Sequence, residues 1–110
     1  MGVGVFLQGK ECDSLPEYFF GTALEKLYLD YKFHWGIGLA GTAGTVEVDF
    51  VVYMPGAIPV EINGDYWHQK DETIRDATIR SYFMRDPIKV EAEKVDSLPK
   101  AINWIKRNLI

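Results

Sequence analysis

The sequence has little cysteine and histidine and no long apolar segment. Its one cysteine, Cys12, cannot close an internal disulfide, which favours a reducing, intracellular environment and predicts an ordinary thiol near a helix start. No apolar run approaches the ~18 residues that a membrane-spanning helix needs, and the first residues lack the charged and apolar regions of a signal peptide. With one Cys and two His, a structural zinc site is not expected either. We therefore expect a cytoplasmic protein with no membrane partner.

Several familiar catalytic motifs are also missing. The glycine-rich stretches at 36–38 and 41–44 lack the Gly-Lys-Ser/Thr of a phosphate-binding loop, and no Rossmann pattern follows a strand. There is no Gly-x-Ser-x-Gly nucleophile elbow. Apolar residues, in contrast, make up 47% of the 110 residues and aromatic residues 14%. We therefore expect a single domain, residues 1–110, with a core of its own rather than a disordered chain.

Acidic and basic residues are unevenly distributed along the chain, which carries a net charge of −4. Residues 1–69 hold nine acidic residues and three lysines, a net of −6, whereas residues 70–110 hold nine basic and seven acidic residues, a net of +2. A negative net charge by itself disfavours nucleic-acid binding, but the second part of the chain can offer basic side chains to phosphates. A solvated helical surface would give the same counts, so both interpretations stay open.

Cap and turn residues divide the chain into elements in the order α-β-β-β-α-β-α. Asp-Ser-Leu-Pro occurs at 13–16 and again at 96–99, and Ser followed by Pro in the first turn predicts helices that begin near Leu15 and Leu98. Alternating and β-branched residues predict strands. The other expected elements are strands over 33–39, 45–53, 58–63 and 88–92 and a helix over 71–84. The mixture favours an α/β fold of the α+β kind, with a four-stranded mixed sheet flanked by helices.

Charged residues interrupt two neighbouring strands. If a three-residue loop follows Tyr53, Asp49 lies directly opposite Glu61, with Cβ atoms about 4.5–5.5 Å apart. Two carboxylates at that distance repel each other unless a cation lies between them, and Mg²⁺ prefers such oxygen ligands. Asp49, Glu61 and the backbone carbonyl of Ile62 are therefore candidate ligands for Mg²⁺, for which Mn²⁺ is expected to substitute. A surface strand with an acidic outer face is the alternative.

Residues near this pair are further candidates for the site. His68 can deprotonate an attacking water or contact a phosphate, or be a partly buried structural histidine. The rings of Tyr66 and Trp67 can stack on bases or pack in the core. Glu17 is placed to close the first helix in a capping box, or to join the metal site through a water. His34, in an aromatic strand, is expected to be structural.

Three short segments, in this order and with these flanking elements, resemble the PD-(D/E)xK nuclease superfamily, in particular its very-short-patch-repair-like endonucleases and small proteins related to them. The segments are Asp49-Phe50, Val60-Glu61-Ile62-Asn63-Gly64 and Trp67-His68. The likeness extends over residues 14–110 and implies a restriction-endonuclease-like core, Mg²⁺-dependent hydrolysis of phosphodiester bonds and DNA as the substrate. It also implies that Asp49 is the central metal ligand and Glu61 the second acidic residue. Glu17 then matches the glutamate of the first helix, and His68 the histidine after the glycine.

One position departs from the superfamily pattern, because Asn63 stands where most members have a lysine. The usual cationic partner of the attacking water is then missing, and Asn63 would orient that water. Lys70, Arg75 and Arg80 are candidates for phosphate contacts, although Arg80 is also placed to pair with Asp76. We expect a small Mg²⁺-dependent DNA endonuclease of the repair or junction-resolving type, acting as a homodimer or with a partner protein. The alternative is a nucleic-acid-binding or assembly module that keeps the fold without turnover.

Overall fold

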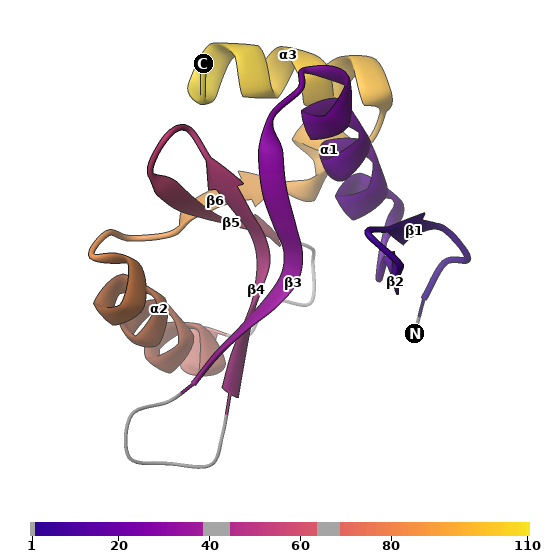
Figure 1. Cartoon of the computed structure of the whole chain (residues 1–110). Coiled ribbons are helices and arrows are strands. Elements are labelled where there is room, and N and C mark those ends of the chain that lie inside the picture. The colour runs from indigo at the N-terminus through magenta and orange to yellow at the C-terminus, as the bar shows by residue number, and fades with distance from the viewer. Residues whose placement is uncertain (1, 39–44, 64–68) are drawn as a thin grey trace.

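The computed structural model describes residues 2–38, 45–63 and 69–110, with only the backbone described at 69–73. In this part of the chain the main sheet has four strands in the order β3-β4-β5-β6 (Figure 1). Their bounds are Asp30–Gly38, Thr45–Tyr53, Ala57–Asn63 and Ile88–Glu91. β3, β4 and β5 are antiparallel neighbours, whereas β6 runs parallel to β5. The predicted mixed sheet is therefore confirmed.

Helices cover both faces of this sheet. α1 (Leu15–Lys26) and α3 (Leu98–Asn108) pack against each other on one face, and α2 (Gln69–Phe83) lies on the other (Figure 1). A 3-10 helix, η1 (Ala92–Val95), leads from β6 to α3. The order α-β-β-β-α-β-α is the predicted one. It is preceded by a short hairpin that the sequence did not indicate, β1 (Phe6–Leu7) and β2 (Lys10–Glu11).

Both predicted helix starts are confirmed by their caps. The Oγ atom of Ser14 accepts a hydrogen bond from the N–H of Glu17 at 3.4 Å, and that of Ser97 accepts one from the N–H of Lys100 at 3.3 Å. Each helix has a proline in its first turn. α1 ends before Tyr28, which has a φ of 57° and is 94% exposed, so this ring does not extend the apolar face of the helix.

The core has two parts, one on each face of the sheet. The larger part lies under α1 and α3 and includes Phe20, Phe33, Phe50 and Ile105. The smaller part, under α2, consists of Ile37, Val48, Val51 and Ile79, with partly buried neighbours. Among the described residues, no helix is both long enough and apolar enough to cross a membrane.

β3 and β4 exchange the faces that they present to these two core regions. Phe33 packs into the larger core, but Trp35, two residues further along, packs against the smaller one. In β4, Phe50 likewise packs into the larger core and Val48 into the smaller one. Regular alternation keeps residues two apart on one face, so both strands reverse their faces between these pairs. In β3 the reversal falls at His34, whose φ of +47° lies in the left-handed region.

The N-terminal hairpin covers the open edge of β3. The side-chain amide of Gln8 donates to the carbonyl of Tyr31 at 2.7 Å and accepts from the N–H of Phe33 at 3.2 Å, as a neighbouring strand would. Lys10 donates to the carbonyls of Phe33 and His34 at 3.0 and 3.1 Å. These bonds occupy edge groups that would otherwise be open to another chain. They also hold the backbone on both sides of His34.

Candidate functional site

Three ionisable residues, His34, Asp49 and Glu61, lie in one row across β3, β4 and β5. The β3–β4 register places His34 opposite Asp49, between two paired rows. The β4–β5 register begins with Tyr53 opposite Ala57, as the predicted three-residue loop requires, and its continuation places Asp49 opposite Glu61. The regular ladder of the described strands is interrupted at His34 and ends before Glu61. This row of ionisable residues therefore coincides with a break in the sheet.

Side chains supply the bonds that the ladder lacks between β4 and β5. The N–H of Asp49 donates to Oε2 of Glu61 at 3.0 Å. The N–H of Ile62 donates to Oδ2 of Asp49 at 2.9 Å. Each carboxyl group therefore satisfies a backbone donor of the opposite strand, and these bonds hold the two acidic residues side by side.

Glu61 is fully buried and forms an ion pair with Arg75 of α2. Nε of Arg75 lies 2.5 Å from Oε1 of Glu61, and its Nη2 lies 3.1 Å from Oε2. The same guanidinium donates to the carbonyl of Glu47. A buried carboxylate is stable only when it is paired, and a two-point contact with a guanidinium is the strongest such pair. Arg75, predicted to contact phosphate, is therefore engaged inside the protein in this structure.

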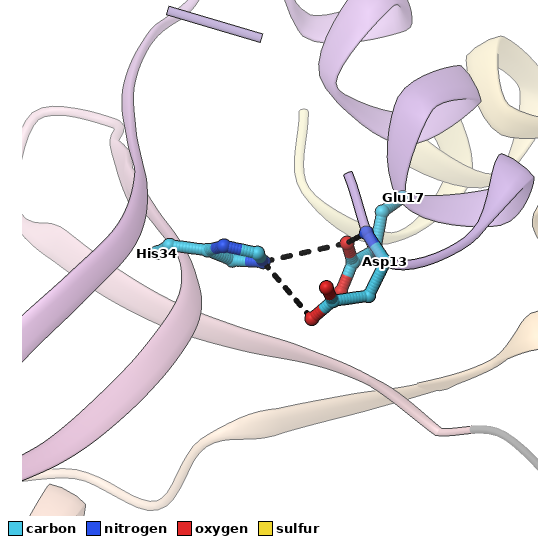
Figure 2. A group of neighbouring side chains, drawn as sticks. All are labelled: Asp13, Glu17 and His34. Carbon is cyan, nitrogen blue, oxygen red and sulfur yellow. Dashed lines mark hydrogen bonds and ion pairs between the residues drawn. The ribbon is translucent and has the colours of Figure 1, made fainter. Parts of the chain in front are cut away.

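On the α1 side, Asp13, Glu17 and His34 come together (Figure 2). Nε2 of His34 lies 3.4 Å from Oε1 of Glu17 and 3.8 Å from Oδ2 of Asp13. The other ring nitrogen, Nδ1, lies 3.6 Å from Oε1 of Glu47. Sequence reasoning assigned neither His34 nor Asp13 to the site. The positive φ that places His34 beside α1 leaves no recognisable signal in the sequence. Asp13, in contrast, stands four residues before Glu17, and this spacing was a signal that could have indicated it.

Glu17 closes the start of α1, much as its position predicted, and it also faces the ionisable residues of the sheet. Its Oε1 accepts a hydrogen bond from the N–H of Asp13 at 2.9 Å, one residue earlier than a regular capping box requires. The same carboxylate faces His34 and lies close enough to Asp49 for their negative charges to interact. The residue is only 6% exposed, so it belongs to the interior of the site.

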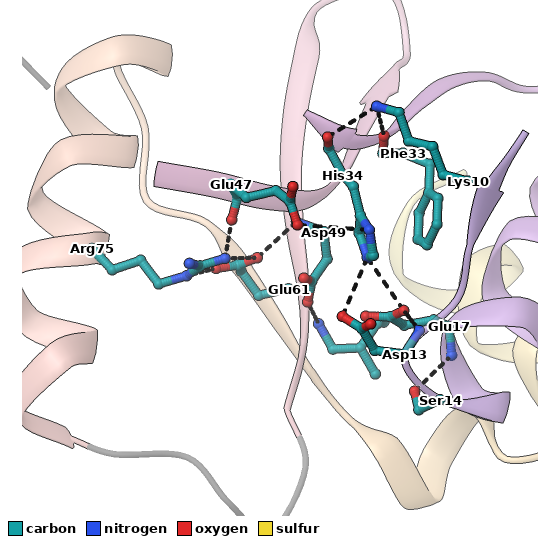
Figure 3. Close-up of polar contacts among 11 residues, drawn as sticks. Lys10, Asp13, Ser14, Glu17, Phe33, His34, Glu47, Asp49, Glu61 and Arg75 are labelled. Atoms are coloured by element: carbon teal, nitrogen blue, oxygen red, sulfur yellow. Dashed lines mark hydrogen bonds and ion pairs between the residues drawn. The ribbon is translucent and has the colours of Figure 1, made fainter. Parts of the chain in front are cut away.

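Together these residues form one network, the ionisable cluster, which consists of Asp13, Glu17, His34, Glu47, Asp49, Glu61 and Arg75. Figure 3 shows Arg75 reaching the cluster from α2, while Glu17 of α1 and Asp13, just before this helix, approach from the other side and Asp49 lies between them. The cluster thus passes from one face of the sheet to the other at the place where the ladder is broken. As far as the described residues show, the cluster holds five carboxyl groups and two groups that can carry a positive charge.

This excess of carboxyl groups changes the proton affinity of Asp49. Burial, followed by the negative charges of Glu61 and Glu17, raises the pKa of Asp49 to about 8. The hydrogen bond from Ile62 and the charge of Arg75 act in the opposite direction but are weaker. At neutral pH this carboxyl group therefore mostly keeps its proton, and a cation bound beside it would favour the ionised form.

The imidazole of His34 responds to the same surplus of negative charge. Burial, the largest single effect, lowers the pKa of His34, but the carboxylates of Glu17, Glu47 and Asp13 together outweigh it, so that the pKa is raised. Both shifts have the same physical cause, the surplus of carboxyl groups over positively charged groups in this cluster.

Of the remaining predicted site residues, only Asn63 has a described side chain in this part of the fold. Asn63 ends β5, and its Oδ1 atom is buried with no hydrogen-bond partner among the described residues. Lys70 lies in α2, but its side chain is outside the described part of the structure. The proposed base His68 and the rings of Tyr66 and Trp67 also lie outside the described residues. The roles predicted for these residues stay predictions.

Arg80 is exposed on α2 and lies near Asp86 rather than forming the predicted pair with Asp76. Its Nε lies 3.7 Å from Oδ1 of Asp86, and Asp76 instead lies 2.6 Å from Nζ of Lys89. The exposed position leaves Arg80 available for the predicted phosphate contact. Glu25, at the other end of α1, accepts a hydrogen bond from the Tyr31 hydroxyl.

Comparison of the chain with protein-family models, with curated proteins and with solved structures finds no match. The resemblance to the nuclease superfamily therefore depends on the residues of the site and on their order among the elements.

Proposed function

We propose that the protein is a metal-dependent DNA endonuclease of the PD-(D/E)xK kind. The observation that carries the proposal is the pair of adjacent carboxyl groups, Asp49 and Glu61, at the break between β4 and β5, with Glu17 beside them. The order of the elements, with an acidic residue on each of two neighbouring strands, supports the superfamily resemblance. DNA as the substrate comes from that resemblance.

The residues of the break fit a Mg²⁺ ion. Among the described residues, Arg75 alone donates a hydrogen bond to Oε1 of Glu61, and they leave this oxygen a second lone pair for a cation. A dication held by Asp49, Glu61 and the carbonyl of Ile62 would remove the repulsion that raises the pKa of Asp49. When bound there, Mg²⁺ would lower the pKa of a water and stabilise charge on a phosphate.

The other residues of the proposal bind the water and the DNA. Asn63 stands where the superfamily has its lysine, and its buried Oδ1, which has no hydrogen-bond partner among the described residues, would accept a hydrogen bond from the attacking water. His68 is the proposed proton acceptor or phosphate contact, and Tyr66 and Trp67 the proposed stacking rings. Lys70 and Arg80 would bind the phosphate backbone. A chain of this size offers little surface for recognition, which favours a homodimer, a partner protein or a branched DNA substrate.

A second candidate function is favoured by the ion pair between Arg75 and Glu61. The guanidinium already neutralises the buried carboxylate, so the fold needs no metal ion at that position. With Asn63 in place of the lysine, this arrangement suits a nucleic-acid-binding or assembly module that does not cleave DNA.

A cleavage assay separates the two functions. Plasmid, mismatched duplex and four-way-junction DNA are incubated with the protein and Mg²⁺ or Mn²⁺, and in parallel with a chelator. Asp49→Asn keeps an acceptor for the N–H of Ile62 and should fold, and Asp30→Asn, an exposed substitution in β3, is the matched control. We expect metal-dependent cleavage that Asp49→Asn abolishes and Asp30→Asn retains.

Other outcomes count against the nuclease. DNA binding that a chelator does not change, without any cleavage, would support the non-catalytic module instead. If folded protein with metal present neither binds nor cuts any of the three DNAs, the nuclease and a DNA-binding module are both wrong, and the assembly module is left.

A further inference from the structure

Three potential metal ligands converge on the α1 side of the ionisable cluster, separately from the carboxyl pair at the break. Asp13 comes from the residue before the helix cap, Glu17 from the first turn of α1, and His34 from β3. One ligand atom from each lies within 4.8 Å of the other two. The side chain of Asp13 is 64% exposed, so solvent has access to this point.

A ring nitrogen of His34 points into this group of ligands. The His34 side chain is only 10% exposed, and its Nε2 atom has no hydrogen-bond partner among the described residues. Buried polar atoms normally have such a partner. The two oxygens nearest to Nε2, Oε1 of Glu17 at 3.4 Å and Oδ2 of Asp13 at 3.8 Å, are themselves potential metal ligands, and an ion among them would contact all three atoms. Figure 2 shows the ring aimed at the carboxyl groups of Asp13 and Glu17. Its 3.4 Å distance to Glu17 is close to the separation of about 3.4 Å between two ligands bound at about 2.1 Å in a tetrahedral site.

The second ring nitrogen of His34 has the environment found in metal-bound histidines. Nδ1 faces the carboxylate of Glu47 at 3.6 Å. Histidines that bind a metal through one nitrogen usually present the other to a carboxylate, which fixes the orientation of the ring and strengthens it as a ligand. Lys10 holds the backbone carbonyl of the same residue, so the ring is positioned from both sides.

We propose that Asp13, Glu17 and His34 bind a divalent transition-metal ion, with Zn²⁺ preferred, at a site distinct from the carboxyl pair Asp49 and Glu61. An imidazole with two carboxylates suits Zn²⁺ and Mn²⁺. Mg²⁺ prefers oxygen ligands alone and binds less tightly to such a set. Three protein ligands leave the fourth tetrahedral position to a water molecule, as in zinc sites that act on substrates.

This site does not depend on the proposed nuclease. Its ligands are not the Mg²⁺ ligands proposed at the break, and metal binding is measured directly, without DNA. The protein can therefore bind Zn²⁺ here whether or not it cleaves a phosphodiester.

Isothermal titration calorimetry of the full chain with Zn²⁺, Mn²⁺ and Mg²⁺ tests the proposal. We expect one Zn²⁺ site, weaker binding of Mn²⁺, and Mg²⁺ binding that is weaker still. Co²⁺ added in place of Zn²⁺ should produce visible absorption bands of a coordinated ion. His34→Asn and Glu17→Gln should abolish this binding, and Glu47→Gln should weaken it about 10–100-fold.

The variants are chosen so that they fold. Asn tolerates positive φ better than most residues, and Gln at position 17 keeps an acceptor for the N–H of Asp13. Glu25→Gln, exposed on the same helix, is the matched control and should bind Zn²⁺ like the wild type. Circular dichroism verifies the fold of each variant.

The proposal is overturned if the folded wild type binds no Zn²⁺. It is equally overturned if Asp49→Asn abolishes Zn²⁺ binding while His34→Asn and Glu17→Gln retain it, because the ion would then lie at the break. Retained Zn²⁺ binding by Asp49→Asn, together with no cleavage of DNA by the wild type, supports this site and rejects the nuclease.

Discussion

The carboxylate of Glu61 accepts a hydrogen bond from the backbone N–H of Asp49, across the point where the ladder between β4 and β5 ends. Asp49 in turn binds the N–H of Ile62. Because backbone donors hold both carboxyl groups, the sheet itself positions them, and no bound ion is needed to bring them together. Burial and the negative charge of the neighbouring Glu61 raise the pKa of Asp49.

That pKa predicts a pH-dependent stability. Between about pH 4, the ordinary pKa of an Asp, and about pH 8, folded Asp49 keeps a proton that the unfolded chain has lost. Its stabilising contribution is therefore complete below about pH 4, declines as the pH rises, and is lost above about pH 8. In urea unfolding between pH 5 and 9, the free energy of unfolding of the wild type should fall by a few kcal/mol as the pH rises, and Asp49→Asn should remove this decline. Asp30→Asn should keep it, and an unchanged slope in Asp49→Asn would contradict the interpretation.

The ion pair of Arg75 with Glu61 should contribute far more than an exposed one. Arg75→Met leaves a buried carboxylate unpaired, and we expect the free energy of unfolding to fall by about 3–5 kcal/mol. Arg75→Lys should lose part of this, since an ammonium cannot reproduce the two-point contact. Arg80→Met, which removes the exposed pair with Asp86, should cost at most about 1 kcal/mol. Equal losses at the two arginines in denaturant unfolding would show that the buried pair has no special role.

Cys12 should be almost unreactive in the folded protein. Burial, followed by the negative charges of Glu17, Asp13 and Glu11, raises the pKa of its thiol to about 11. Because the thiolate is the reactive form, alkylation by iodoacetamide at pH 8 should be at least about 100-fold slower than in denatured protein. Mass spectrometry of timed samples measures both rates. Similar rates in the two states would mean that the segment before α1 is open.

Local signals in the sequence were sufficient for much of the fold. The serine caps, the alternation in β4 and the three-residue loop after Tyr53 all depend on interactions between residues close in the chain. Their prediction therefore needed no knowledge of the tertiary structure, and it included the register that places Asp49 opposite Glu61. The short β1–β2 hairpin was not predicted, since two-residue strands are too short to show a period.

Other parts of the site were decided by tertiary contacts. His34 reaches Asp13 and Glu17 because its strand reverses faces at a positive φ, and Lys10, far from it in the sequence, holds its carbonyl. Arg75, which the sequence offered as a phosphate contact, forms an ion pair with Glu61 because α2 brings it to the sheet.

The sequence by itself determined the order of the elements and the neighbouring positions of Asp49 and Glu61, because capping, alternation and turn length act over a few residues. Only the tertiary structure decided which charges surround that pair. The partners come from α1, β3 and α2, and electrostatic interactions depend on distance in space rather than on separation along the chain.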